Sequence, residues 1–136
     1  LGTFRAMNEE WRQQAHKLIK DFVTQTCAAY GATADIEIPS GYPCLINDTA
    51  LTARATEWGR ELAGAANVHH LDMRMGAEDF AFYTHHMPGC FFRIGTNRGN
   101  TEFTASVHNA RFDINEDAMK TGMSMMAWAA VKSLGT

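Results

Sequence analysis

The sequence predicts an α/β fold, because segments with a helical period alternate with short segments typical of β-strands. Apolar residues recur at helical spacing through residues 9–30, and again in two segments that begin near residues 48 and 116. Between them, residues 33–38 alternate strictly between apolar and polar side chains, and residues 90–94 form a compact apolar run. Alternation of helices and strands in this way is typical of an α/β layer.

The first part of the chain predicts a strand, a helix and a second strand. Residues 1–7 have the composition of a strand, and Asn8 is a suitable N-cap for the helix that follows. Gly31 should end this helix, because glycine readily adopts the left-handed conformation needed there. Since such a unit requires a partner half to bury its sheet, we expect further sequence before Leu1.

A cluster of breaking residues, Pro39-Ser40-Gly41-Tyr42-Pro43, predicts a domain boundary between residues 1–43 and 44–136. Asn47 or Asp48 should cap the next helix, and Gly64 should end it.

The remaining elements follow in the second part. We expect a short strand at residues 67–73, a helix that opens at Glu78, the apolar strand at residues 90–94 and a last helix capped by Asn115. The buried stripe expected for the last helix comprises Met119, Met123, Met126 and Ala130.

Composition excludes several functions. The net charge of -3 and pI near 6.0 give no electrostatic footprint for nucleic acid, and the scattered basic residues do not favour a membrane surface. No apolar run approaches the roughly 18 residues that a membrane span needs. The 3 cysteines have no paired spacing, which favours reduced thiols in a cytoplasmic protein.

His108 is the strongest candidate for chemistry. It follows a long polar loop, residues 95–106, and precedes a helix, so its imidazole could face a cleft. A neutral imidazole is a common ligand of zinc and related divalent ions. On the residues alone, a structural or solvated histidine remains the alternative.

Glu78 and Arg5 also allow two interpretations each. Glu78 and Asp79 could serve as acid and base, but adjacent helical side chains point about 100° apart, and both could simply complement the helix dipole. Arg5 could bind a substrate carboxylate, or it could be an ordinary solvated arginine.

Four motifs occur in one order and together resemble the M20 metallopeptidase family, in its branch of hippurate hydrolases and N-acyl-amino-acid deacylases. They are Gly2-Thr3-Phe4-Arg5, Gly41-Tyr42-Pro43, Gly76-Ala77-Glu78-Asp79-Phe80 and His108-Asn109-Ala110-Arg111-Phe112-Asp113. The resemblance covers essentially the whole chain but only the C-terminal part of such an enzyme. The family's Cys-Gly-His-Asp motif and Glu-Glu pair, which include its general base, are absent.

The resemblance implies roles for several residues. His108 corresponds to the family's last metal ligand, Arg5 would clamp the substrate carboxylate, and Gly76 and Glu78 would line the cleft. Residues 1–43 would be half of a ferredoxin-like lid and dimerisation domain, and residues 44–136 the C-terminal part of a zinc-peptidase-like catalytic domain. No catalytic base is assigned within this chain.

The function implied is that of a cytoplasmic metal-dependent amidohydrolase, which would cleave small hippurate-like N-acyl amino acids to a carboxylic acid and an amino acid. It would use one or two divalent ions (zinc, manganese or cobalt) and form a homodimer through the lid. The isolated fragment is expected to be inactive. The alternative is a non-catalytic dimerisation or scaffold fragment, because the chain supplies neither a base nor a second ligand at sensible spacing.

Overall fold

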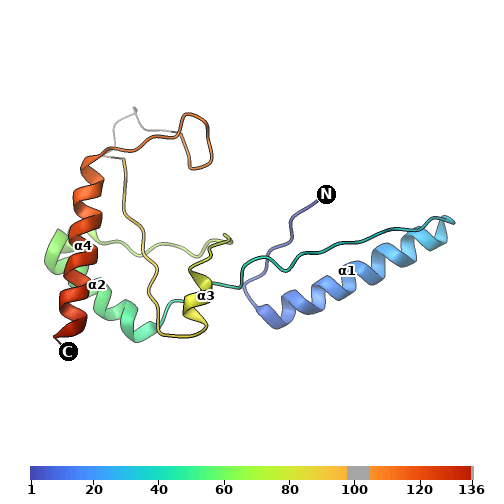
Figure 1. Ribbon diagram of the computed structural model, residues 1–136, viewed down its shortest axis with the longest axis horizontal. Coiled ribbons are helices and arrows are strands. Elements are labelled where there is room, and N and C mark those ends of the chain that lie inside the picture. The colour runs from blue at the N-terminus through green and yellow to red at the C-terminus, as the bar shows by residue number, and fades with distance from the viewer. Residues whose placement is uncertain (98–104, 136) are drawn as a thin grey trace. The chain divides into compact units, whose positions relative to one another are not determined.

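The computed structural model describes residues 1–97 and 105–135. Its helices are α1 (Glu9–Ala29), α2 (Thr49–Ala63), the short 3-10 helix η1 (Ala65–Asn67), α3 (Ala81–Thr84) and α4 (Asp117–Leu134) (Figure 1). Contacts divide the chain into two compact units: unit 1 comprises residues 1–46 and 72–88, and unit 2 comprises residues 47–71 and the described part of 89–136. The units reflect contacts within this chain alone, so the expected domain boundary after residue 43 stays a prediction.

The predicted α/β fold is wrong for this structure. No β-strand occurs among the described residues, so neither a catalytic-domain sheet nor half of a ferredoxin-like lid is present there. Alternating apolar residues show which segments would suit a strand, but a strand forms only where its backbone pairs with a neighbour. The segments predicted as strands, residues 1–7, 33–38, 67–73 and 90–94, contain no such pairing.

Helix α1 begins and ends where its capping residues predict. Oδ1 of Asn8 accepts a hydrogen bond from the N–H of Trp11 at 2.7 Å, which is the geometry of an N-cap. At the other end, Gly31 has a φ of 68°, and the N–H groups of Gly31 and Ala32 donate back to carbonyl oxygens in the last turn. This is a Schellman motif, in which glycine adopts the left-handed conformation without strain.

A polar cluster in unit 1 ties the segment after α1 back to the first turn of that helix. The carboxylate of Glu9 accepts hydrogen bonds from Nε of Arg12 at 2.9 Å and from the N–H of Cys44 at 2.7 Å. Arg12 also donates to the carbonyl oxygen of Ser40, and Nε2 of His85 lies 3.1 Å from the carbonyl oxygen of Cys44. We call these five residues the Glu9 cluster.

Helix α2 is capped by Asp48, while its neighbour Asn47 has a different role. Oδ1 of Asp48 accepts a hydrogen bond from the N–H of Leu51 at 2.7 Å. The side chain of Asn47 bonds both to the N–H and to the carbonyl oxygen of Phe91, at 2.8 and 2.9 Å. The N–H of Asp48 donates to the carbonyl oxygen of Gly89. These bonds hold the extended segment around Phe91 at the start of α2.

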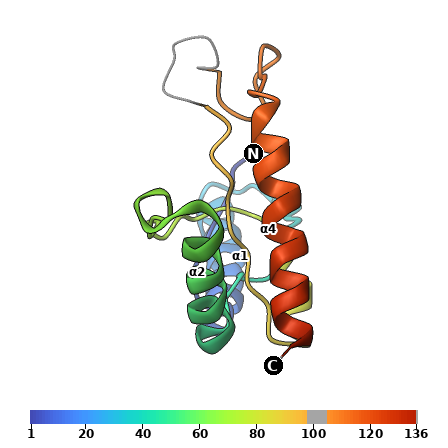
Figure 2. The same cartoon turned by 90° about the vertical axis from the view of Figure 1, so that its left-hand side faces the viewer.

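Helices α2 and α4 pack side by side and form the core of unit 2 (Figure 2). Their contact centres on Gly59 and Met125, both buried. A Cβ added at Gly59 would lie 3.5 Å from Cγ2 of Val68 and 3.7 Å from Cε of Met125, which is ordinary van der Waals contact. At the rim, Nζ of Lys132 pairs with the carboxylate of Glu61 at 2.7 Å.

The buried stripe predicted for α4 is wrong. Met119, Met123 and Met126 are 52%, 66% and 62% exposed, whereas Met125 is only 8% exposed. The less exposed side of α4 includes Gly122, Met125, Trp128 and Ala129, and methionines lie on both sides of the helix. The helical period therefore could not identify which side is buried. Apolar as α4 is, no helix among the described residues is long and apolar enough to cross a membrane.

Candidate functional site

His108 lies on an exposed turn with an uncommon backbone conformation. Its φ is 71°, and among the described residues no other residue except glycine has a positive φ. The N–H of Asn109 donates to the carbonyl oxygen of Ser106 at 3.1 Å, which places His108 at the third position of a four-residue turn. A positive φ at this position alone is the geometry of a type II turn, where glycine is the usual residue.

The left-handed backbone conformation of His108 costs free energy, and packing of its side chain does not offset that cost. For a residue with a Cβ it costs on the order of 1 kcal/mol, although histidine tolerates it better than most residues. The side chain of His108 is exposed, so it fills no core. Because the imidazole is exposed and fills no core, it is available to bind a ligand such as a metal ion. Residues 98–104 of the predicted polar loop lie outside the described residues.

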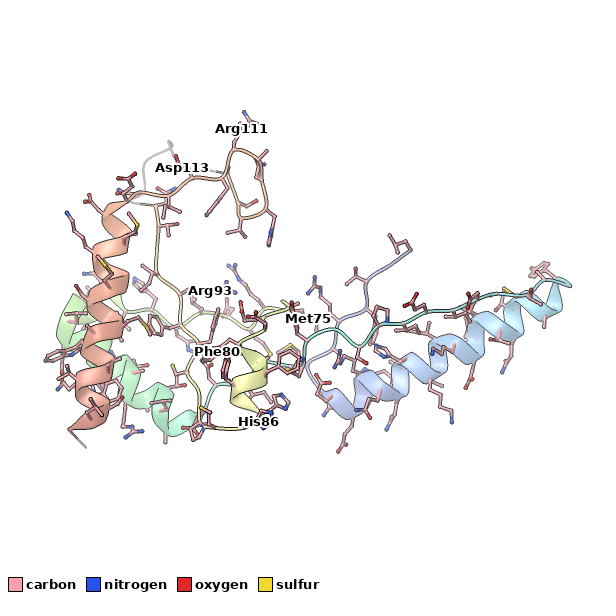
Figure 3. All side chains as sticks on the ribbon, viewed as in Figure 1. Met75, Phe80, His86, Arg93, Arg111 and Asp113 are labelled. Carbon is pink, nitrogen blue, oxygen red and sulfur yellow. The ribbon has the colours of Figure 1, made fainter. Side chains whose placement is uncertain are left out.

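Glu78 and Gly76 lie in the stretch that leads into α3 (Figure 3 labels the flanking Met75 and Phe80). Glu78 is half-buried, and its Oε1 accepts a long hydrogen bond of 3.4 Å from the N–H of Phe80. This contact fits the local role of supporting the helix start. The helix expected to open at Glu78 contains only Ala81–Thr84. A Cβ added at Gly76 would meet no atom within 4 Å, so no contact in the described structure requires glycine there.

Arg5 is exposed on the segment before α1, and its side chain makes no ion pair or hydrogen bond with the rest of the described chain. Arg5, Gly76 and Glu78 belong to unit 1, whereas His108 belongs to unit 2. The roles assigned to these residues therefore stay predictions. The described residues contain no group of three or more histidine, cysteine, aspartate or glutamate side chains that could hold a metal ion. Within them His108 fits one ligand position of a metal site and no more.

The Glu9 cluster was not anticipated from the sequence, because its members are far apart along the chain. Partial burial opposes the ionisation of Glu9. The hydrogen bonds from Arg12 and Cys44, with the positive charges of Arg12 and His85, outweigh it and lower the pKa of Glu9. Burial raises the pKa of the Cys44 thiol, and the charge of Glu9 raises it further, against a smaller effect of Arg12. The only local signal was the three-residue spacing of Glu9 and Arg12 on a helix.

Sequence comparison defines the class of protein to which this chain belongs. Residues 4–132 match the profile of peptidase family M20/M25/M40. The chain is therefore a member of the M20 peptidase family, and the resemblance inferred from its four ordered motifs is confirmed.

Individual relatives carry the names of hydrolases. The chain is 33% identical to sll0100 of Synechocystis sp., provisionally named a hydrolase, over 95% of this chain and 33% of that protein. It is 34% identical to YhaA of Bacillus subtilis, provisionally named an amidohydrolase, over 96% of this chain and 33% of that protein. It is 32% identical to the N-acetylcysteine deacetylase of Bacillus subtilis, over 99% of this chain and 34% of that protein. The chain thus spans about a third of the length of these relatives. No solved structure matches it.

Proposed function

We propose that a full-length protein containing this chain is a metal-dependent amidohydrolase that cleaves the amide bond of N-acyl amino acids. Family membership supports a hydrolase. The names of YhaA and of the N-acetylcysteine deacetylase support amide cleavage next to an amino-acid portion. Hippurate-like compounds, in which an aromatic acyl group is joined to glycine, are the substrates we would test first.

The observation that carries this proposal is the turn at His108. The turn presents an exposed imidazole from a strained backbone position, which suits a metal ligand better than a packing residue. A divalent ion in such a site would polarise the scissile carbonyl group and lower the pKa of a bound water. Zinc, manganese and cobalt ions all bind imidazole. The site would hold one or two such ions, and its remaining ligands would come from outside this chain.

Three further residues have proposed roles in binding substrate. The guanidinium of Arg5 would bind the carboxylate of the amino-acid portion, since its planar fork matches a carboxylate. Gly76 and Glu78 would line the cleft, with Glu78 orienting ligands or substrate. We also propose, from the family likeness, that the protein is cytoplasmic and dimerises through residues 1–43.

The test compares two histidine variants of the full-length protein. His108→Ala should leave the protein folded, deplete its metal and abolish hydrolysis of N-benzoylglycine and N-acetylcysteine. His86→Ala, at an exposed histidine past α3 (Figure 3), should keep wild-type metal content and rate. Thermal melts establish folding, and elemental analysis measures the metal. Wild-type metal content in His108→Ala would remove the basis of the proposal, and inactivity caused by unfolding would return His108 to a structural role.

A second candidate is a non-catalytic dimerisation or scaffold fragment. It is favoured by the large apolar side chains that α1 leaves exposed, namely Trp11, Leu18 and Phe22. Such a face suits association with another subunit. Metal analysis of the full-length protein after dialysis separates the two candidates, because one tightly held ion per protein chain would contradict the scaffold. Light scattering that showed a monomer would contradict the association.

A further inference from the structure

Asn109, directly after His108, makes three hydrogen bonds to the backbone around the turn. Its N–H donates to the carbonyl oxygen of Ser106 at 3.1 Å, and its carbonyl oxygen accepts from the N–H of Phe112 at 2.9 Å. Its side-chain Oδ1 accepts from the N–H of Arg111 at 2.9 Å. Asn109 is therefore the shared corner of two consecutive turns, and its side chain braces the second of them.

The conformation of His108 depends on this corner. If the backbone of His108 left the left-handed region, the peptide group between His108 and Asn109 would rotate, and the hydrogen bond from Asn109 to Ser106 would break. The side-chain bond of Asn109 to Arg111 is local and independent of any core, because these turn residues are exposed. Figure 3 places Arg111 and Asp113 on the loop that precedes α4.

We propose that Asn109 is a positioning residue for His108: its N–H closes the turn that directs the imidazole, and its side-chain hydrogen bond to Arg111 braces the following turn and so keeps this shared corner in place. This inference rests on the proposed function, in which that imidazole binds a divalent ion. Asn109 itself contacts neither metal nor substrate in this scheme. Its side-chain oxygen acts on His108 only through the corner, by bracing the turn that begins at Asn109.

Asn115 provides a matched control for Asn109. Its Oδ1 accepts a hydrogen bond from the N–H of Asp117 at 3.0 Å, the same local bond to a residue two positions on. It lies at the start of α4, beyond the His108 turn. Asn115→Ala therefore removes an equivalent bond without touching the corner that His108 depends on.

The experiment has one readout on this chain and one on a full-length protein. In this chain, the strong intraresidue contact between the N–H and Hα protons that marks a positive φ, observed by NMR, should be present at His108 in wild type and in Asn115→Ala. It should be lost in Asn109→Ala. In the full-length protein stripped with chelator, calorimetric titration with Zn²⁺ alone should show binding weakened about tenfold or more by Asn109→Ala. Asn109→Ser, whose hydroxyl can accept the same bond, should restore most of it.

The outcomes separate this inference from the proposed function. If His108→Ala leaves Zn²⁺ binding unchanged, the metal-ligand role is wrong and the positioning role falls with it. If His108→Ala weakens binding while Asn109→Ala binds as wild type does, only the positioning role is wrong. If Asn109→Ala does not fold, Asn109→Ser provides the test. A folded Asn109→Ser protein that binds Zn²⁺ as weakly as His108→Ala would overturn the inference.

Discussion

Asn47 and Phe91 are joined by two hydrogen bonds, in which the amide side chain of Asn47 takes the place of a neighbouring strand. Its Nδ2 donates to the carbonyl oxygen of Phe91 at 2.9 Å, and its Oδ1 accepts from the N–H of Phe91 at 2.8 Å. A side-chain amide carries the same donor and acceptor as a peptide group, so it can satisfy both groups of one residue of an extended segment. The segment around Phe91 is thereby fixed to the start of α2 without a sheet.

Removing this amide should destabilise unit 2. Asn47→Ala loses both hydrogen bonds, and each contributes about 0.5–1.5 kcal/mol, so we expect a loss of about 1–3 kcal/mol in the free energy of unfolding. Asn47→Asp keeps the acceptor for the N–H of Phe91 but loses the donor, so its loss should be intermediate. Urea unfolding measures both. Asn67→Ala is the control, since it removes a single exposed bond to the carbonyl oxygen of Ala63. Equal losses in Asn47→Ala and Asn67→Ala would contradict the bridging role.

Two glycine substitutions should change stability in opposite directions. Gly59→Ala places a methyl group in ordinary van der Waals contact with Val68 and Met125. It also removes glycine from the interior of α2, so it should stabilise the chain by about 0.5–1 kcal/mol. Gly31→Ala forces a side chain into the left-handed conformation and should destabilise it by about 1 kcal/mol. Shifts of the urea midpoint report both effects. A loss of stability in Gly59→Ala would show that the α2–α4 contact has no room for the methyl group.

The backbone of His108 predicts an unusual order of stability among its variants. His108→Gly should be more stable than His108→Ala by about 1 kcal/mol, because glycine adopts the positive φ without strain. Neither variant has an imidazole, so both should lose the proposed metal equally. Parallel thermal melts and metal analysis test the two statements separately. Equal stability of the two variants would mean that the turn does not impose the left-handed conformation.

The lowered pKa of Glu9 predicts a loss of stability in acid. A carboxyl group whose pKa is lower in the folded than in the unfolded chain stabilises the fold fully above its unfolded value, for which 4.5 is the reference. This stabilisation is lost as the pH falls through the lower, folded value. Urea midpoints at about pH 6.5 and about pH 3.5 should therefore differ less in Glu9→Gln than in wild type. Glu10→Gln, at the exposed neighbour, should keep the wild-type difference.

Local signals in the sequence predicted the ends of α1 and α2 well. They were less accurate for the later helices: α3 contains only Ala81–Thr84, and the N-cap of α4 is Glu116 rather than the expected Asn115. Asn8, Asp48, Gly31 and Gly64 lie at helix ends, because capping needs only a few neighbouring residues. The strands were not predictable in the same way, since pairing depends on distant segments and the described chain offers none. The prediction of which α4 residues are buried failed for a related reason. Methionines line two sides of α4, and only the contact with α2 determines that Met125 is the buried one.

Less of the candidate site could be predicted. The motif around His108 identified the residue and the family, but no pattern in the sequence announced its positive φ or the hydrogen bonds of Asn109. The Glu9 cluster joins residues as far apart as Glu9 and His85, and no local period connects them. The sequence singled out candidate side chains one at a time, whereas the hydrogen-bond partners described here are visible only in the folded chain.

Because methionines lie on both the exposed and the buried side of α4, the two sides of this helix differ in how readily oxidants attack them. Peroxide converts an accessible methionine to its sulfoxide, which is polar and chiral. Met119, Met123 and Met126 are open to such attack, whereas Met125 is shielded between the helices. In this chain the outer methionines would therefore be oxidised first, and their sulfoxides would leave the α2–α4 contact intact. Only after the helices separate would the sulfur of Met125 be exposed, so its oxidation would report the opening of the core.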